Sequence, residues 1–191
     1  MILKSERIHK SEVRGQKPLL RANGQKLIAF FFLPVFVLFS GCYSFKDVSI
    51  KPEIKTFYVK YIENKARYIN PQLSPQITDK LRQKIVNQTR LSPVQSEGAD
   101  YDIGGVVTGY DVSTSAISGQ QASINRLTVT ITIILKNNKD PNDKKTNFEA
   151  SVSRNFDYNA QLALSQAEPQ LNESIIKNMV DEIFNRLFSN W

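Results

Sequence analysis

The stretch from Asn125 to Lys136 reads NRLTVTITIILK and alternates between aliphatic and polar side chains. Its aliphatic members are Leu127, Val129, Ile131, Ile133 and Leu135, and its hydroxyl-bearing members are Thr128, Thr130 and Thr132. Because successive side chains of a strand point to opposite faces of a sheet, this period of two predicts a strand with one buried and one solvated face. We expect the threonines to lie on a sheet face that no helix covers.

The residues that follow predict a hairpin. Residues 137–147 are polar and contain the turn-forming pair Asp140-Pro141. The alternation then resumes in a strand whose apolar positions are Phe148, Ala150, Val152 and Phe156. A polar connection between two alternating segments is typical of paired antiparallel strands, so we expect a long hairpin.

Two more strands are expected nearer the N-terminus. Residues 54–62 read IKTFYVKYI and residues 101–112 read YDIGGVVTGYDV, both rich in β-branched and aromatic side chains. Gly104, Gly105 and Gly109 are not followed by the Gly-Lys-Ser/Thr motif and helix start of a phosphate-binding loop. They indicate strand bulges or close backbone approach instead.

Two segments have helical spacing. In the first, we expect Ser74 to be the N-cap, Pro75 to occupy the first helical position, and the helix to end near Thr89. Its stripe consists of Ile77, Leu81, Ile85 and Gln88. Pro169 is expected to open the second helix, whose broad apolar face continues to Trp191. This face favours packing on the sheet, although its methionine and aromatic side chains would also suit a partner groove.

These elements occur in the order β-α-β-β-β-α. A right-handed crossover would make the first two strands parallel. We therefore expect an α+β fold: a two-layer sandwich with a mixed four-stranded sheet and both helices on one face.

The charge distribution disfavours a nucleic-acid partner. The whole chain carries +7, but residues 1–41 hold seven Lys and Arg against two Glu, a net +5, which leaves +2 for residues 42–191. Binding to phosphate backbones requires clustered cations, and these residues are close to neutral. We expect no nucleic acid among the partners.

Cysteine and histidine usage disfavours an enzyme. The chain has one cysteine, Cys42, and one histidine, His9. Downstream of Cys42 there is thus no histidine for a Ser-His-Asp or Cys-His arrangement, nor for the shells that zinc prefers. Carboxylate-pair or Ser/Lys chemistry stays open, but no spacing singles out a pair. We expect neither catalysis, nor a cofactor, nor a metal.

The N-terminal residues have the layout of a signal peptide. A run of 13 apolar residues, from Leu27 to Phe39, follows a basic stretch and precedes the small pair Ser40-Gly41. As a helix this run would be only about 20 Å long, against roughly 30 Å of hydrocarbon in a bilayer. A membrane-spanning anchor is the weaker alternative. The basic stretch of 26 residues is long for a signal peptide, which leaves open a translation start downstream of Met1.

Ser40-Gly41-Cys42 resembles a lipobox, where a diacylglycerol is attached to the cysteine thiol and the peptide is cut between Gly41 and Cys42. Phe39 departs from the usual aliphatic residue, and the alternative is a structural cysteine. We expect a signal peptide over residues 1–41, a lipidated tether over 42–52 and a single domain over 53–191. Two or three acyl chains give stable membrane anchoring.

Several motifs in order resemble the LptE family of lipopolysaccharide-assembly lipoproteins, in a branch typical of Bacteroidota. They are GCYSF (residues 41–45), VSI and PEIKTFYV (48–59), NPQLS (70–74), NQT (87–89), NRLTVT (125–130), FDY (156–158) and DEIFNRLFSNW (181–191). The resemblance covers nearly all of the chain after Cys42, and none of its motifs is a catalytic signature.

The resemblance implies a non-enzymatic outer-membrane lipoprotein that lies in the lumen of the LptD β-barrel, plugs and helps assemble it, and assists lipopolysaccharide transport. The Thr128, Thr130 and Thr132 face would suit a polar lumen. Cations near lipopolysaccharide phosphates would be Arg126, Lys139, Lys144 and Lys145. Tyr43 follows Cys42 in place of an inner-membrane retention aspartate, which fits outer-membrane sorting. The alternative is an envelope lipoprotein that serves as a structural or interaction module of a cell-wall or secretion complex.

Overall fold

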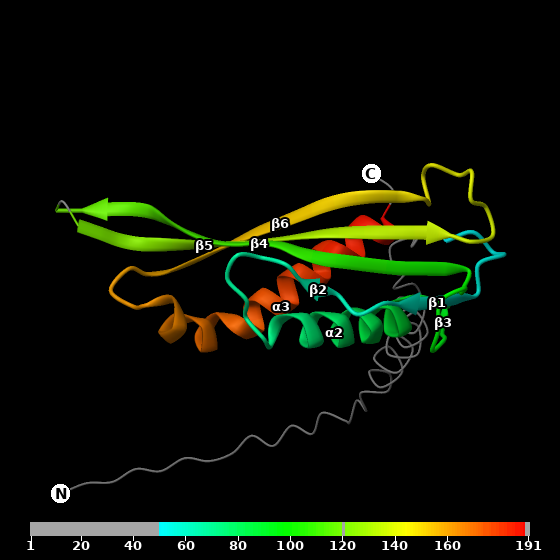
Figure 1. Cartoon of the computed structure of the whole chain (residues 1–191), viewed down its shortest axis with the longest axis horizontal. Helices are drawn as coiled ribbons and strands as arrows, with labels where there is room; N and C mark the ends of the chain where they lie inside the picture. Colours follow the sequence, from blue (N-terminus) through cyan, green and yellow to red (C-terminus); the bar gives the residue numbers. More distant parts are fainter. Residues whose placement is uncertain (1–49, 120, 190–191) are drawn as a thin grey trace, which may run out of the picture. The chain divides into compact units, whose positions relative to one another are not determined.

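The computed structural model describes residues 50–119 and 121–189 (Figure 1). In chain order the elements are β1 (Thr56–Val59), β2 (Glu63–Asn64), α2 (Leu73–Gln88), β3 (Ser92–Pro93), β4 (Tyr101–Ser118), β5 (Gln121–Asn137), β6 (Phe148–Asn159) and α3 (Leu164–Phe188). The α+β class is confirmed, with two helices and a mixed open sheet, but the expected four strands are wrong because the sheet has six. Within these ranges, neither helix has the length and apolar character needed to cross a membrane. The predicted signal peptide and Cys42 lie outside the described residues.

Parallel and antiparallel ladders meet at β4. The strand order is β3-β1-β4-β5-β6, and β2 also pairs with β4. β1 runs parallel to β3 and β4, β2 runs parallel to β4, and β5 pairs in antiparallel fashion with both β4 and β6. The parallel pairing of β1 with β4 confirms the expectation for the strands on either side of α2, which a crossover connection requires.

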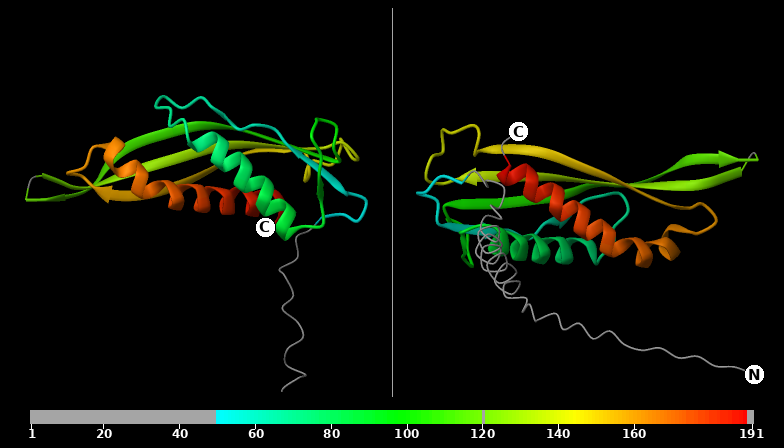
Figure 2. Two further views of the ribbon diagram at one scale, coloured as in Figure 1. Left: turned by 90° about the horizontal axis from the view of Figure 1, so that it is seen from below. Right: turned by 180° about the vertical axis from the view of Figure 1, so that it is seen from behind.

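β5 has the predicted alternation. Its aliphatic side chains at 127, 129, 131, 133 and 135 are at most 1% exposed, while the three threonines between them are partly exposed. β5 also pairs with β6 along its length, which confirms the predicted hairpin. Figures 1 and 2 show both helices on the same side of the sheet. The apolar faces of α2 and α3 join the buried side of β5 in one hydrophobic core.

The predicted strand over residues 54–62 is two short strands, β1 and β2. The ladder with β4 is interrupted between them because the backbone N–H of Ile62 donates to Thr78 Oγ1 in α2 (3.1 Å) instead of to a strand. Pairing resumes where the N–H of Lys65 donates to the carbonyl of Val107 (2.9 Å). Ser92 and Pro93, which the sequence did not indicate as a strand, form β3 at the sheet edge, where a proline is tolerated.

The glycines of β4 match the prediction of bulges and close approach at two of three positions. The register with β5 shifts between Val107 and Gly109, as a bulge requires. A side chain at Gly105 would come within 3.1 Å of the carbonyl oxygen of Thr132, so the backbones there approach closely. Gly104 has open space around it and shows no such need.

β4 and β5 extend beyond the helices as a hairpin arm, residues 112–119 and 121–126, visible at the left of Figure 1. No element was predicted between residues 113 and 124. Gly119 has a φ of +57° at the turn, a conformation that glycine adopts without steric cost. Ile117 is 72% exposed on this arm.

The expected starts of both helices are wrong. α2 begins at Leu73, and Asn70 organises the turn before it, because Asn70 Oδ1 accepts the N–H of Gln72 (2.9 Å). Ser74 therefore lies inside the helix and not at its N-cap.

α3 begins at Leu164, five residues before Pro169. The N–H of Ala163 donates to the side chain of Gln166 (3.0 Å), which stabilises this earlier start. The missing N–H of Pro169 removes only the bond to the carbonyl of Ser165, an exposed residue that water can reach.

Candidate functional site

The polar face of β5 is paired side chain by side chain with β6. Thr128 Oγ1 donates to Asn155 Oδ1 (2.9 Å), and the hydroxyls of Thr130 and Ser153 lie 3.1 Å apart. Such cross-strand pairs stabilise a sheet without burying it. Thr132 lies opposite Ser151 in the same register. The expected barrel-facing residues therefore share one sheet face, and the hydroxyls of Thr128 and Thr130 are engaged by side chains of β6.

Arg126 continues this face toward the hairpin arm and is already paired. Its Nε and Nη2 donate to the two carboxylate oxygens of Asp157 (2.7 and 2.9 Å). Hydrogen bonding from Arg126, together with its charge, holds the pKa of Asp157 below its ordinary value. A phosphate group would have to compete with Asp157 for the Arg126 guanidinium, which is already held in a bidentate ion pair.

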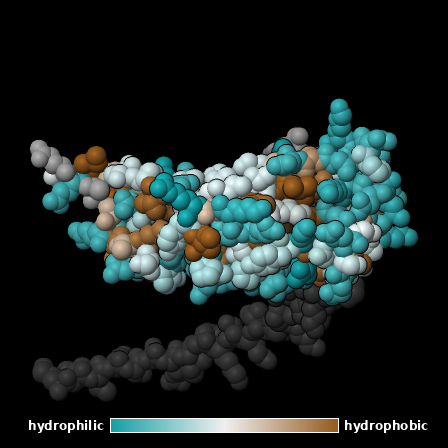
Figure 3. Space-filling model, viewed as in Figure 1, coloured by the Kyte–Doolittle hydropathy of each residue, from teal (hydrophilic) through white to brown (hydrophobic). Residues whose placement is uncertain are grey.

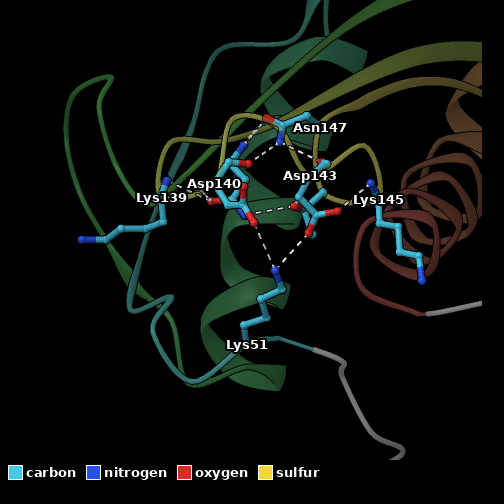
Figure 4. Close-up of polar contacts among 8 residues, drawn as sticks. Lys51, Lys139, Asp140, Asp143, Lys145 and Asn147 are labelled. Atoms are coloured by element: carbon cyan, nitrogen blue, oxygen red, sulfur yellow. Dashed lines mark hydrogen bonds and ion pairs between the residues drawn. The ribbon is translucent and has the colours of Figure 1, made fainter.

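The loop over residues 138–147 is ordered by two asparagines. Asn137 is buried, and its Oδ1 accepts the backbone N–H groups of Lys139 and Asp140. Asn147 Nδ2 donates to the carbonyls of Asp140 (2.8 Å) and Asp143 (2.9 Å) (Figure 4). The conformation of the loop is thus fixed by hydrogen bonds from these two side chains.

Lys51 joins this loop to the start of the domain. Its Nζ lies 3.4 Å from Asp140 Oδ2 and 3.1 Å from Asp143 Oδ2 (Figure 4). The N–H of Lys145 and the side chain of Lys51 both donate to the Asp143 carboxylate, which lowers the pKa of Asp143. Arg90 also donates to the carbonyl of Ile50 (2.6 Å). The C-terminal end of the predicted tether, Ile50 and Lys51, is therefore docked on the domain.

The four predicted phosphate-contacting cations do not gather at one place. Lys139 pairs with Asp100 (3.4 Å), whereas the exposed Lys144 and Lys145 form no side-chain ion pair within the part of the chain that the structure describes. Arg126 lies eleven residues before the end of β5, about 36 Å away along an extended strand. The loop lysines and Arg126 therefore belong to different ends of the sheet.

A partly buried polar cluster, which lies where the two helices begin, was not predicted from the sequence. Tyr110 donates to Glu168 Oε1 (2.9 Å), Tyr68 donates to Glu168 Oε2 (3.1 Å), and the two tyrosine rings stack at 5.5 Å. Asn70 Nδ2 also reaches Glu168 (3.3 Å). Burial, more than the nearby carboxylate, raises the pKa of Tyr110. These residues are far apart in sequence, so no local pattern could reveal them.

Residues 50–119 and 121–189 contain no group of acidic, histidine and cysteine side chains placed to hold a metal ion. Their polar side chains form a paired sheet face, an ordered loop and the polar cluster where the two helices begin. The class defined here is a small α+β domain that offers hydrophilic contact surfaces.

The chain belongs to the LptE family of lipopolysaccharide-assembly proteins, whose family model matches residues 54–187. This family is non-enzymatic, comprises outer-membrane-associated lipoproteins, and associates with LptD-like outer-membrane proteins and lipopolysaccharide. Among curated proteins, none matches the chain.

Solved structures with similar folds include several lipoproteins. An uncharacterised lipoprotein B from Nitrosomonas europaea is 18% identical, with 75% of this chain and 88% of that chain covered and a TM-score of 0.48. A minor lipoprotein from Acinetobacter baumannii is 13% identical, with 70% and 91% covered and a TM-score of 0.45. The rare lipoprotein B from Shewanella oneidensis is 13% identical, with 68% and 89% covered and a TM-score of 0.42.

Proposed function

We propose that this chain is anchored in the outer membrane through acylated Cys42, lies within the lumen of an LptD-like barrel, plugs and helps assemble that barrel, and assists lipopolysaccharide transport. Membership of the LptE family connects the chain with lipopolysaccharide assembly. The observation that carries the finer proposal is the hydrophilic face of β5 and β6, because a large barrel has a polar, water-filled interior. A protein that lies inside the barrel needs such a face on the side that contacts the barrel wall.

The docked tether supports the anchored orientation. Ile50 and Lys51 contact the domain, so only seven residues separate them from Cys42. The eight steps from Cys42 to Ile50 span at most about 28 Å when fully extended. A lipid on Cys42 would therefore hold the 138–147 loop close to the membrane.

Under this proposal, the loop meets phosphate groups of lipopolysaccharide through Lys144 and Lys145. Their ammonium groups are exposed, and no carboxylate of the described residues pairs with them. Lys is a point-charge ligand for phosphate and needs no fixed geometry, which suits a loop.

Photocrosslinking in living cells tests the orientation. Crosslinkers placed at Thr130 or Lys144 should capture the barrel protein or lipopolysaccharide, whereas one at Ile131 should capture neither because that side chain is fully buried. Equal adducts from positions 130 and 131 would contradict the proposed use of the polar face.

Affinity purification of the tagged chain tests the partner. It should recover a large outer-membrane barrel, and depletion of the chain should stop assembly of that barrel and delivery of lipopolysaccharide. Recovery of a cell-wall or secretion complex without a barrel, with lipopolysaccharide delivery intact after depletion, would replace the proposal with a structural-module function.

A further inference from the structure

A groove of about 480 Å³, lined mostly by residues with polar or charged side chains, runs along the seam between α2 and α3. The helices contact each other along this seam, and two side-chain bridges cross it: Asn172 Nδ2 to Gln76 Oε1 (3.1 Å) and Lys84 Nζ to Asp181 Oδ1 (2.8 Å). A second hollow of about 360 Å³ continues past Asn172 toward Glu168. The surface visible in Figure 3 is mostly hydrophilic, with separate hydrophobic patches.

The walls of the main groove are rich in carboxamides. They are contributed by Gln76, Gln83, Asn87, Gln88 and Asn172. Each carboxamide offers two donors and an acceptor, which matches the paired hydroxyl groups of a sugar. Ile176 and Val180 are the apolar residues of the lining.

One carboxamide is incompletely satisfied. Asn172 Oδ1 is shielded from solvent and accepts no hydrogen bond from any residue that the structure describes. Asn172 lines both hollows. Buried acceptors are nearly always paired in native proteins, so a bound molecule that draws this side chain toward the groove would supply the missing bond with a hydroxyl donor.

The groove also carries a cationic rim. Lys80 and Lys177 are exposed there and form no ion pair within residues 50–119 and 121–189, whereas Lys84 is already paired with Asp181. Glu173 is the remaining acid of the lining. Two unpaired ammonium groups beside sugar-matching amides favour a saccharide that carries phosphate or carboxylate groups.

The groove begins at the end of the domain that is tied to the tether. Gln88 lies two residues before Arg90, whose guanidinium holds the carbonyl of Ile50. From Gln88 to Gln76 the groove follows twelve residues of α2, about 18 Å at the rise of an α-helix. A glycolipid whose acyl chains stay near the membrane could therefore lay its carbohydrate along the helices.

We propose that the α2–α3 groove binds the phosphorylated oligosaccharide of lipopolysaccharide. The proposal rests on the proposed function and adds to it a site separate from the 138–147 loop. A partner helix is a poorer occupant, because Ile176 and Val180 are only 5% and 4% exposed and offer little apolar surface.

The test uses the full chain, purified in detergent, and a fluorescent phosphorylated core oligosaccharide cleaved from lipopolysaccharide. Binding is followed by fluorescence anisotropy. The double variant Lys80→Glu/Lys177→Glu should weaken binding about tenfold or more, since two charge-assisted contacts become repulsive. Asn172→Leu should weaken binding without changing its salt dependence, because it removes a neutral contact.

Lys60→Glu/Lys65→Glu is the matched control, since it makes the same charge change on exposed lysines outside the groove. It should leave binding unchanged. Circular dichroism melts of all variants separate loss of binding from loss of folding. Enzymatic removal of phosphate from the oligosaccharide should weaken binding to the unmodified chain and not to the Lys80→Glu/Lys177→Glu variant.

Equal binding by the folded groove variants and the unmodified chain would overturn the proposed site, as would preferential capture of a helical peptide from LptD-like barrels at this seam. Either outcome would leave the proposed function intact if depletion of the chain still stopped lipopolysaccharide delivery. Intact delivery after depletion would overturn the proposed function itself.

Discussion

At the scale of single residues, the Asp143 carboxylate holds the 138–147 loop to the start of the domain. It accepts the N–H of Lys145 (3.0 Å) and pairs with Lys51 (3.1 Å). Both contacts favour the charged carboxylate, so its pKa in the folded protein is lower than its ordinary value of 3.8. A lowered folded-state pKa means that this group stabilises the loop above the ordinary value and ceases to do so as pH falls through the folded-state pKa.

Acid titration of the Lys145 amide should therefore report a transition with a midpoint below pH 3.8. Nuclear magnetic resonance spectra recorded between about pH 5 and pH 2 cover the expected window. Asp143→Asn should abolish the transition, because an amide does not titrate in this range. A midpoint at or above the ordinary value would contradict the hydrogen-bonded arrangement at Asp143.

The polar cluster around Glu168 leads to a second prediction that concerns a single residue. Tyr110→Phe removes the hydroxyl that donates to Glu168 and should lower the free energy of unfolding by about 1–3 kcal/mol, because the half-buried Glu168 carboxylate and the buried Asn70 amide lose a partner. Tyr58→Phe is the control, since the Tyr58 hydroxyl makes no hydrogen bond to the residues described. Urea unfolding followed by circular dichroism measures both variants. Equal stability of the two would show that the cluster is not coupled to folding.

At the scale of elements, α3 supplies a large part of the core. Ile183 is fully buried on its apolar face, so Ile183→Asp would bury a charge with no partner and cost several kcal/mol of a total stability of about 5–15 kcal/mol. We expect the purified chain to lose its cooperative thermal melt. A normal melt combined with loss of barrel binding would instead identify this face as an interface. Lys177→Asp, on the exposed side of the same helix, is the control.

The strands that could be predicted are those with a strong local pattern. β5 alternates over ten residues, so its burial follows from the pleat alone, and the hairpin with β6 follows from the polar connection between them. The hairpin arm could not be predicted, because residues 113–118 read STSAIS and contain little apolar alternation. Their strand conformation comes from pairing with β5.

Element boundaries depend on contacts between distant segments. β1 and β2 are separate because Thr78 of α2 accepts the N–H of Ile62, a contact across 16 residues. Pro169 indicated a helix start because proline suits the first turn, yet Gln166 stabilises an earlier one. The groove between the helices combines residues about 90 positions apart in the sequence. The polar sheet face and the cations could be predicted from the sequence, whereas the groove between α2 and α3 could not.

At the scale of the whole molecule, the proposed anchored orientation depends on Cys42, which lies outside the described residues. Cys42→Ala should abolish labelling by a fatty-acid probe and release the chain from membranes, because the thiol proposed to carry the lipid is lost. Ser40→Ala keeps a small residue before the cut and should leave labelling unchanged. Mass spectrometry of the mature N-terminus locates the cleavage. Persistent labelling, or a mature N-terminus elsewhere, would contradict lipidation at this cysteine.

The hairpin arm gives the domain a long reach. β5 has 17 residues and, at the rise of an extended strand, measures about 56 Å. A bilayer with its headgroups is about 40–45 Å thick. One end of β5 enters the loop that Lys51 ties to the tether, and the other end reaches the arm tip beside Ile117. If the lipid on Cys42 rests in the inner leaflet and β5 stands upright in the barrel, the arm tip would arrive at the cell surface while the tether stays in the periplasm.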